Sequence, residues 1–265
     1  MIAVLAALAL AVTPAQYLQV RQAENGGFAE PGAATTPGLT AWAALGLAAA
    51  GNPDERALAY LRSHEDGLRD ATELALALAA EAASGAHSAA LLARVLALRR
   101  ASGAIGPTLN STFWGVIALK QASAAVGPET RRYILARQAR SGGWSWTAGS
   151  EPDSNDTAAA IQALRALDVA GAPIRRGLAY LRALQNRDGG FELTSGRGSD
   201  AQSTAWAIQA FLAAGAKPGR AAYTYLARLR RPDGSYRYSA KYAVTPVWVT
   251  AQVLPALAGR SFPLR

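Results

Sequence analysis

Two kinds of helical segment alternate along the chain. The first kind is short and carries arginines on one side, as in residues 176–187, whereas the second is almost entirely apolar, as in residues 156–167 and 205–214. A helix with one apolar stripe packs on one face, but a helix that is apolar all round must be buried on every side. The pattern therefore predicts an all-α protein in which amphipathic outer helices surround apolar inner helices.

A recurring turn follows each short segment and precedes each apolar one. Its fullest copies read glutamine, three residues, glycine, one residue and an aromatic, and weaker copies keep only part of this. The copies are Gln22–Phe28, Gln138–Trp144, Gln185–Phe191 and the partial Arg230–Tyr236, with weaker turns at Gly67 and Gly103. Repetition at a fixed period predicts stacked helix pairs.

A glycine lies at the end of each apolar segment. They are Gly51, Gly85, Gly127, Gly171, Gly215 and Gly259. We expect each glycine to stop an inner helix just beyond its C-cap. Six helix pairs result, and neither end of the array has the polar face that an open solenoid needs on its terminal repeats. The sequence therefore predicts a closed α6/α6 toroid, a double-layered helical barrel of six repeats.

The N-terminal residues suggest export. Ile2 to Val12 is an apolar run that is too short to span a bilayer, and Thr13-Pro14-Ala15 supplies the small residues of a cleavage site. We expect residues 1–15 to be a signal peptide and residues 16–265 to form the toroid, secreted or at the cell surface with no membrane span in the mature chain. The alternative is a buried N-terminal helix, because no Lys or Arg precedes the run.

The composition narrows the classes of partner. The net charge is +9, and 51% of residues are apolar against 17% charged. Most arginines fall near predicted helix ends, where cations complement the helix dipole. No basic run alternates with aromatics as a base-stacking surface would, so we expect no nucleic-acid partner. The chain has no cysteine, which excludes disulfides and thiolate ligands.

The repeated turns resemble the QW motifs of the squalene cyclases, and this resemblance extends from about residue 16 to residue 259. The same toroid superfamily includes protein prenyltransferase β subunits and transcobalamin-type binders. The resemblance implies a structural role for the turns, in which the glutamine supports a helix end and packs on the aromatic ring.

The resemblance also allows two activities, alkene cyclisation and prenyl transfer, to be compared with the residues present. Squalene-type cyclases protonate an alkene with the third residue of an Asp-x-Asp-Asp-Thr-Ala motif, and the matching stretch here, Asp153–Ala158, has Asn155 at that place. An amide cannot donate this proton, which argues against cyclase activity. Prenyltransferase β subunits hold zinc with Asp, Cys and His. With no Cys, and only His64 and His87 as histidines, we expect no metal site.

A second resemblance points to binding. The segment Ser154–Ala160 is similar to a stretch of transcobalamin and intrinsic factor that begins an inner helix, and Asp156 and Thr157 match the residues that face the corrin ring in that family. It implies a corrinoid as a possible ligand. The family's β domain is absent from this chain, so any lid would be a separate chain, or the partner would be a transporter component.

Polar and aromatic residues gather where the inner helices begin, which is the usual lining of a small-molecule site. The candidate ligand-binding residues are Trp42, Asn110, Trp146, Asp153, Asn155, Asp156, Thr157, Asp200, Gln202, Trp206, Tyr238, Tyr242 and Trp248. If the protein is an enzyme, Asp153 and Asp156 are the catalytic candidates. The other interpretation of these two aspartates is that they cap the inner helix.

The sequence thus favours a secreted or surface toroid that binds a small to medium hydrophobic ligand, an isoprenoid or a corrinoid, and requires no cofactor. The first alternative is an enzyme, either a diverged terpene cyclase or prenyltransferase, or a carbohydrate-active barrel. The second is a protein-interaction ring that uses its outer arginines.

Overall fold

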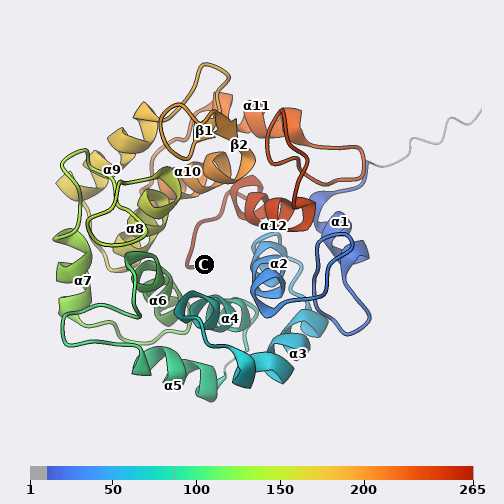
Figure 1. The fold of residues 1–265 in the computed structure, drawn as a ribbon, viewed down its shortest axis with the longest axis horizontal. Coiled ribbons are helices and arrows are strands. Elements are labelled where there is room, and N and C mark those ends of the chain that lie inside the picture. Colours follow the sequence, from blue (N-terminus) through green and yellow to red (C-terminus); the bar gives the residue numbers. More distant parts are fainter. Residues whose placement is uncertain (1–10, 87, 265) are drawn as a thin grey trace, which may run out of the picture.

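A computed structural model describes residues 11–86 and 88–264 of the chain, and this part contains twelve α-helices and one two-stranded sheet. Successive helices alternate between an outer and an inner ring (Figure 1). The all-α, double-layered prediction is confirmed.

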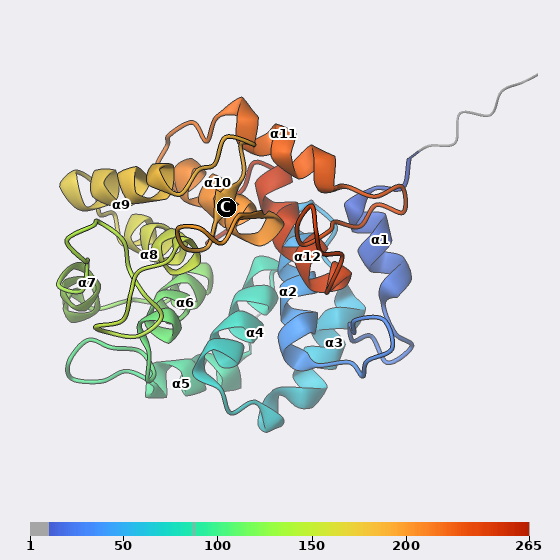
Figure 2. The ribbon, with the colours of Figure 1, turned by 45° about the horizontal axis from the view of Figure 1, so that its top comes forward.

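The outer helices are α1 (Pro14–Arg21), α3 (Glu55–His64), α5 (Ala89–Ala97), α7 (Pro128–Leu135), α9 (Ala172–Ala183) and α11 (Arg220–Leu229). The inner helices are α2 (Pro37–Ala49), α4 (Ala71–Ala83), α6 (Leu109–Gln121), α8 (Ser154–Ala166), α10 (Ala201–Ala213) and α12 (Pro246–Leu257). A short 3-10 helix, η1 (Glu65–Gly67), follows α3, and the antiparallel strands β1 (Phe191–Glu192) and β2 (Ser199–Asp200) precede α10. Figure 2 shows the outer helices wrapped around the inner ring.

The inner ring is closed. Each inner helix packs against the next, and α12 packs against α2. At this seam a Cβ on Gly46 of α2 would lie 2.5 Å from the carbonyl oxygen of Ala251 in α12, so only glycine permits the approach. The apolar residues of the inner helices are buried around the whole circumference, as segments without a polar face require.

The repeated turns join neighbouring repeats. In the turn before α8, Gly142 has a φ of +97°, and a Cβ there would lie 2.5 Å from the carbonyl oxygen of Arg176 in α9. The Gln138 amide donates to the carbonyl oxygens of Gly142 and Pro173, each at 2.8 Å, and so ties the turn to the start of α9. In the last turn, a Cβ on Gly234 would meet the backbone of Thr13, the N-cap of α1. The outer layer therefore closes as well.

A threonine ties each of five turns to its own inner helix. Thr157 Oγ1 accepts a hydrogen bond from the backbone N–H of Trp144 at 2.9 Å. The same bond links Thr40 to Phe28, Thr112 to Ile105, Thr204 to Phe191 and Thr250 to Tyr236. These threonines are completely buried, and they satisfy N–H groups that would otherwise be orphaned inside the protein.

The prediction that a glycine stops each inner helix is wrong at two positions. Gly127 and Gly171 are the N-caps of the outer helices α7 and α9. The left-handed residues after α6 and α8 are instead Ser123 and Asp168, with φ of +57° and +58°. Short polar side chains can adopt this conformation. The weak turn at Gly67 also departs from the pattern, because it lies in η1.

Carbonyl groups of the rim loops cap the inner helices. In each case the donor is an N–H group at the start of an inner helix. The acceptor is a carbonyl group of the following repeat, two residues after the aromatic residue that ends the turn. Trp146 O accepts from the N–H groups of Leu109 and Asn110, Leu193 O from Ser154, and Tyr238 O from Ala201. At the seam, Glu30 lies in the same register, and its carboxylate accepts from Val247 N at 3.1 Å and Trp248 N at 2.8 Å. The first repeat thereby caps the last inner helix.

Glu30→Ala should lower the free energy of unfolding by about 1–2 kcal/mol, because two N–H groups at the start of α12 lose their acceptor. Thr245, the N-cap of α12, makes no side-chain cap that would compensate. Urea denaturation measures the change. Glu24→Ala, which removes an exposed glutamate from the same loop region, is the control. Equal stabilities of the two variants would contradict the seam role of Glu30.

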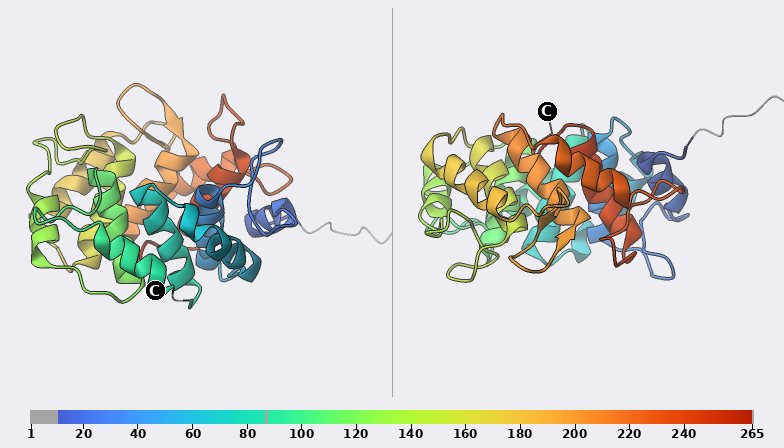
Figure 3. Two further views of the ribbon diagram at one scale, coloured as in Figure 1. Left: turned by 60° about the horizontal axis from the view of Figure 1, so that its bottom comes forward. Right: turned by 90° about the horizontal axis from the view of Figure 1, so that it is seen from above.

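The C-terminal segment closes the end of the ring opposite the rim loops (Figures 1 and 3). The Phe262 side chain is 2% exposed, and its ring packs edge-on against Trp114 with 5.6 Å between centroids. Gln162 Oε1 of α8 accepts from Phe262 N at 2.8 Å, and the Gln121 amide of α6 pairs with both backbone groups of Leu264.

The expected signal peptide falls largely on residues 1–10, which lie outside the described residues. The expected cleavage point after Ala15 falls inside the first turn of α1, whose N-cap is Thr13. In the described part of the chain, every helix is too short or too polar to cross a bilayer.

Candidate functional site

A cavity of about 420 Å³ opens where the inner helices begin. Its volume lies within the usual range for small-molecule sites. Its walls are formed by Trp42, Thr72, Leu76, Asn110, Trp114, Trp146, Asp153, Asn155, Asp156, Leu193, Gln202, Trp206, Trp248 and Gln252. None of these described lining residues is Arg or Lys, and the exposed surface of the cavity is mostly apolar.

Three tryptophans on alternate inner helices meet in the cavity. Trp42 of α2, Trp114 of α6 and Trp206 of α10 pack edge to face, with centroid distances of 5.0, 5.4 and 5.6 Å. Each follows the N-cap of its helix by six residues. Phe262 supports Trp114 from the C-terminal side. The result is a packed cluster of indole rings, which is an environment that attracts positive charge.

The carboxyl group of Asp156 is the most perturbed polar group of the cavity. Its residue is 3% exposed and lies in the first turn of α8. Burial raises the pKa of Asp156 to about 8, and the negative charge of Asp153 adds to the effect, whereas a hydrogen bond from Asn110 opposes it. Burial beside another carboxyl group therefore favours the protonated form of Asp156.

Two neighbours orient the Asp156 carboxyl. The Asn110 side-chain N–H donates to Asp156 Oδ1 at 2.8 Å, and the Asn110 oxygen accepts from the Thr72 hydroxyl at 3.3 Å. The amide oxygen thus lies on the Thr72 hydroxyl and the NH₂ group on the carboxyl. Asp153 lies beside them as the N-cap of α8 and accepts from Asp156 N at 2.8 Å. The capping interpretation thus holds for Asp153 and is wrong for Asp156.

The raised pKa makes stability depend on pH. Below about pH 4 the Asp156 carboxyl is protonated in both the folded and the unfolded chain. Between the ordinary value of 3.8 and about 8 only the folded form keeps the proton, so the free energy of unfolding falls by up to about 1.4 kcal/mol per pH unit. Asp156→Asn should remove this loss and gain stability relative to the natural chain as pH rises. Urea denaturation at several values between pH 4 and pH 8 measures the free energy of unfolding of both proteins. If this energy changes with pH in the same way in both, the assignment is contradicted.

The structure places nine of the thirteen candidate ligand-binding residues on the cavity wall: Trp42, Asn110, Trp146, Asp153, Asn155, Asp156, Gln202, Trp206 and Trp248. Thr157 does not reach the cavity, because its hydroxyl holds the turn at Trp144. Asp200, Tyr238 and Tyr242 line a separate hollow of about 280 Å³, together with Arg197 and Lys241. Here Asp200 caps α10 through Ser203.

Sequence reasoning did not assign Thr72, Leu76, Leu193 and Gln252 to the site. The register of the inner helices contains the signal for two of them. Residues two and six positions after an N-cap face the cavity in several repeats, and Thr72 and Leu76 stand at these positions after Asp70. Gln252 gave no such signal, since α12 begins with a left-handed N-cap that shifts its register.

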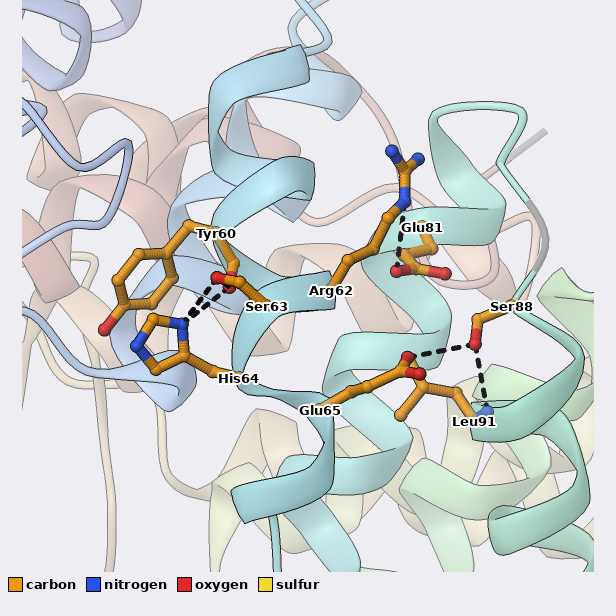
Figure 4. A network of polar contacts seen from close by, with 8 residues as sticks. All are labelled: Tyr60, Arg62, Ser63, His64, Glu65, Glu81, Ser88 and Leu91. Carbon is orange, nitrogen blue, oxygen red and sulfur yellow. Dashed lines mark hydrogen bonds and ion pairs between the residues drawn. The ribbon is translucent and has the colours of Figure 1, made fainter.

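A second group of polar residues lies in the outer layer (Figure 4). His64 stacks on Tyr60 with 4.0 Å between ring centroids, and its Nδ1 lies 2.8 Å from the Tyr60 carbonyl oxygen. The Ser88 hydroxyl donates to Glu65 at 3.0 Å and also caps α5. Over residues 11–86 and 88–264, no three His, Cys, Asp or Glu side chains gather as metal ligands. His87, the second histidine considered, lies outside the described residues.

No known protein family and no curated protein matches the sequence. The fold, however, matches solved structures. The type II terpene cyclase MstE from Scytonema is 19% identical with a TM-score of 0.69, over 92% of this chain and 95% of that one. A variant of the same enzyme was solved with its substrate, geranylgeranyl dihydroxybenzoate, and matches with the same TM-score at 17% identity.

Two further solved structures share the fold. The ent-copalyl diphosphate synthase of Streptomyces platensis is 21% identical with a TM-score of 0.62, over 84% of this chain and 50% of that one. The protein geranylgeranyltransferase-I of Candida albicans, complexed with GGPP, is 13% identical with a TM-score of 0.64, over 83% of both chains. The chain therefore shares its α/α toroid fold with these terpene cyclases and with this prenyltransferase.

Proposed function

We propose that the protein is a diverged terpene-cyclase-like enzyme, which converts a bulky isoprenoid in the tryptophan-lined cavity by proton transfer from Asp156. The observation that carries the proposal is a buried carboxyl group with a raised pKa at the wall of an apolar cavity. The neighbouring folds act on or bind isoprenoids, as the names of their substrates and ligands state. The proposal of an enzyme replaces the sequence-based prediction of a secreted binding protein, which has less support.

The chemistry follows from the contacts of Asp156. Its O–H bond breaks as the proton attaches to a substrate alkene, and a tertiary carbocation forms. The Asn110 N–H then stabilises the resulting carboxylate. The indole faces stabilise the cation while the apolar walls exclude water. The cation closes a ring or shifts, and loss of a proton regenerates both the alkene and the acid.

The position of the acid separates this chain from the squalene-type cyclases. The resemblance assigns the proton to the third residue of the motif, which is Asn155 here. Asp156 is the next residue along α8 and supplies the carboxyl instead. The Asn155 substitution is also the observation that favours the second candidate function, a toroid that binds an isoprenoid without converting it.

Incubation with isoprenoids in heavy water separates the two functions. Geranylgeraniol and geranylgeranyl dihydroxybenzoate are suitable probes, and mass spectrometry detects the products. The enzyme should release isomerised or cyclised products that carry one deuterium for each proton donated by Asp156. Quenching of tryptophan fluorescence without any product would instead identify the protein as a binder. If no quenching and no product are detected, both functions are overturned.

A further inference from the structure

Gln252 presents an unpaired hydrogen-bond donor at the cavity. The residue lies on α12, lines the cavity and is 1% exposed. Its Oε1 accepts from Trp206 Nε1 at 2.7 Å, whereas its Nε2 has no hydrogen-bond partner. An indole nitrogen can only donate, so Trp206 fixes which end of the amide is oxygen. The free end is therefore the NH₂ group.

A second unpaired polar atom lies on the neighbouring helix. Gln209 of α10 donates from Nε2 to the backbone oxygen of Gln252 at 3.2 Å, and its own Oε1 is buried without a partner. Leaving one buried polar atom unpaired costs about 1–3 kcal/mol, and such atoms in a folded protein call for an explanation. Gln209 does not line the cavity, so the Gln252 donor is the group that a ligand in the cavity can reach, and its complement is an oxygen acceptor.

The rest of the lining excludes a charged partner for these amides. A diphosphate or carboxylate end group requires Arg or Lys, and the described cavity residues include neither. The negative charge of Asp153 would repel an anion further. The oxygen that Gln252 binds is therefore neutral.

We infer that the natural ligand is a neutral isoprenoid with an oxygen group, an alcohol or an ether, whose oxygen accepts a hydrogen bond from Gln252 Nε2. This inference rests on the proposed function, because it names the class of substrate for the same cavity. Gln252 fixes the oxygen end of the ligand at α12. The chain of the ligand then lies among the tryptophans, within reach of the acid on α8.

A set of three ligands with one skeleton tests the inference. Geranylgeraniol offers a donor and an acceptor, its methyl ether only an acceptor, and the parent hydrocarbon neither. Affinities are measured by quenching of tryptophan fluorescence. The alcohol and the ether should each bind about 3- to 10-fold more tightly than the hydrocarbon. Equal affinities for all three would overturn the inference, and the proposed function would still stand.

Two variants assign this preference to its residue. Gln252→Met should abolish the preference of the alcohol and the ether over the hydrocarbon, whereas Gln209→Met, at an amide that does not line the cavity, should keep it. Both should keep the affinity for the hydrocarbon, which reports intact packing. If either variant fails to fold, the ligand series on the natural chain still decides. If water alone pairs the Gln252 amide, the three ligands bind alike. Absence of any isoprenoid binding would instead reject the proposed function itself.

Discussion

Asp156→Asn should lower the rate of product formation about 10²- to 10⁴-fold, which is the usual contribution of a general acid. The asparagine has nearly the same shape and can still contact Asn110, but it has no carboxyl proton to give. Affinity for isoprenoids should remain within a few-fold of the natural value, because the tryptophan walls are unchanged. Mass spectrometry of the products and fluorescence titration of the ligand measure the two quantities separately.

A matched control for this substitution is Asp168→Asn. Asp168 lies just beyond the other end of α8, and asparagine tolerates its left-handed backbone. This variant should keep both product formation and affinity. Undiminished turnover by Asp156→Asn would show that another group donates the proton. A parallel loss in both variants would point to damage of α8 and not to lost chemistry.

Phe262→Ala should lower the free energy of unfolding by about 3–5 kcal/mol, which is typical of a large buried aromatic side chain. The effect should reach the cavity, because Phe262 packs against Trp114, and Trp114 contacts both other tryptophans of the cluster. With the space below it empty, Trp114 is free to move and the affinity for isoprenoids should change. Urea denaturation and fluorescence titration give the two results.

Phe211→Ala is the matched control for the C-terminal segment. Phe211 is equally buried on α10, but its ring faces the outer layer, with the Arg182 guanidinium 4.0 Å from its centroid. It should lose comparable stability and keep its ligand affinity. If both variants bind isoprenoids identically, Phe262 has no part in shaping the cavity.

The repeat made the fold predictable, since a periodic pattern specifies one unit and its copies. The apolar inner segments required burial on all sides, and the turn glycines required close backbone contacts, so both layers of the ring followed from local residues. The ends of α6 and α8 did not follow, because Ser123 and Asp168 adopt a conformation usually reserved for glycine. Helix ends depend on single residues that periodicity does not constrain.

The site was only partly predictable. The register of the inner helices placed Trp42, Trp206 and Asp156 correctly near one opening, because side chains three to four residues apart share a helix face. Thr157 matches the same motif, yet its hydroxyl holds a backbone N–H, a role that only the five repeated threonine bonds make visible. Gln252 acquires its meaning from Trp206 across a helix interface, and such a contact leaves no trace in the sequence.

The cap that Glu30 places on α12 spans 217 positions of the chain. During synthesis from the N-terminus, the first inner helices are made long before the residues that cover their last face. Until α12 emerges, the growing arc exposes apolar helices to the crowded cell, a state in which chains aggregate. Because long-range contacts also form slowly, this protein should depend on chaperones more than an open helical repeat of equal length, in which each new repeat shields the one before it.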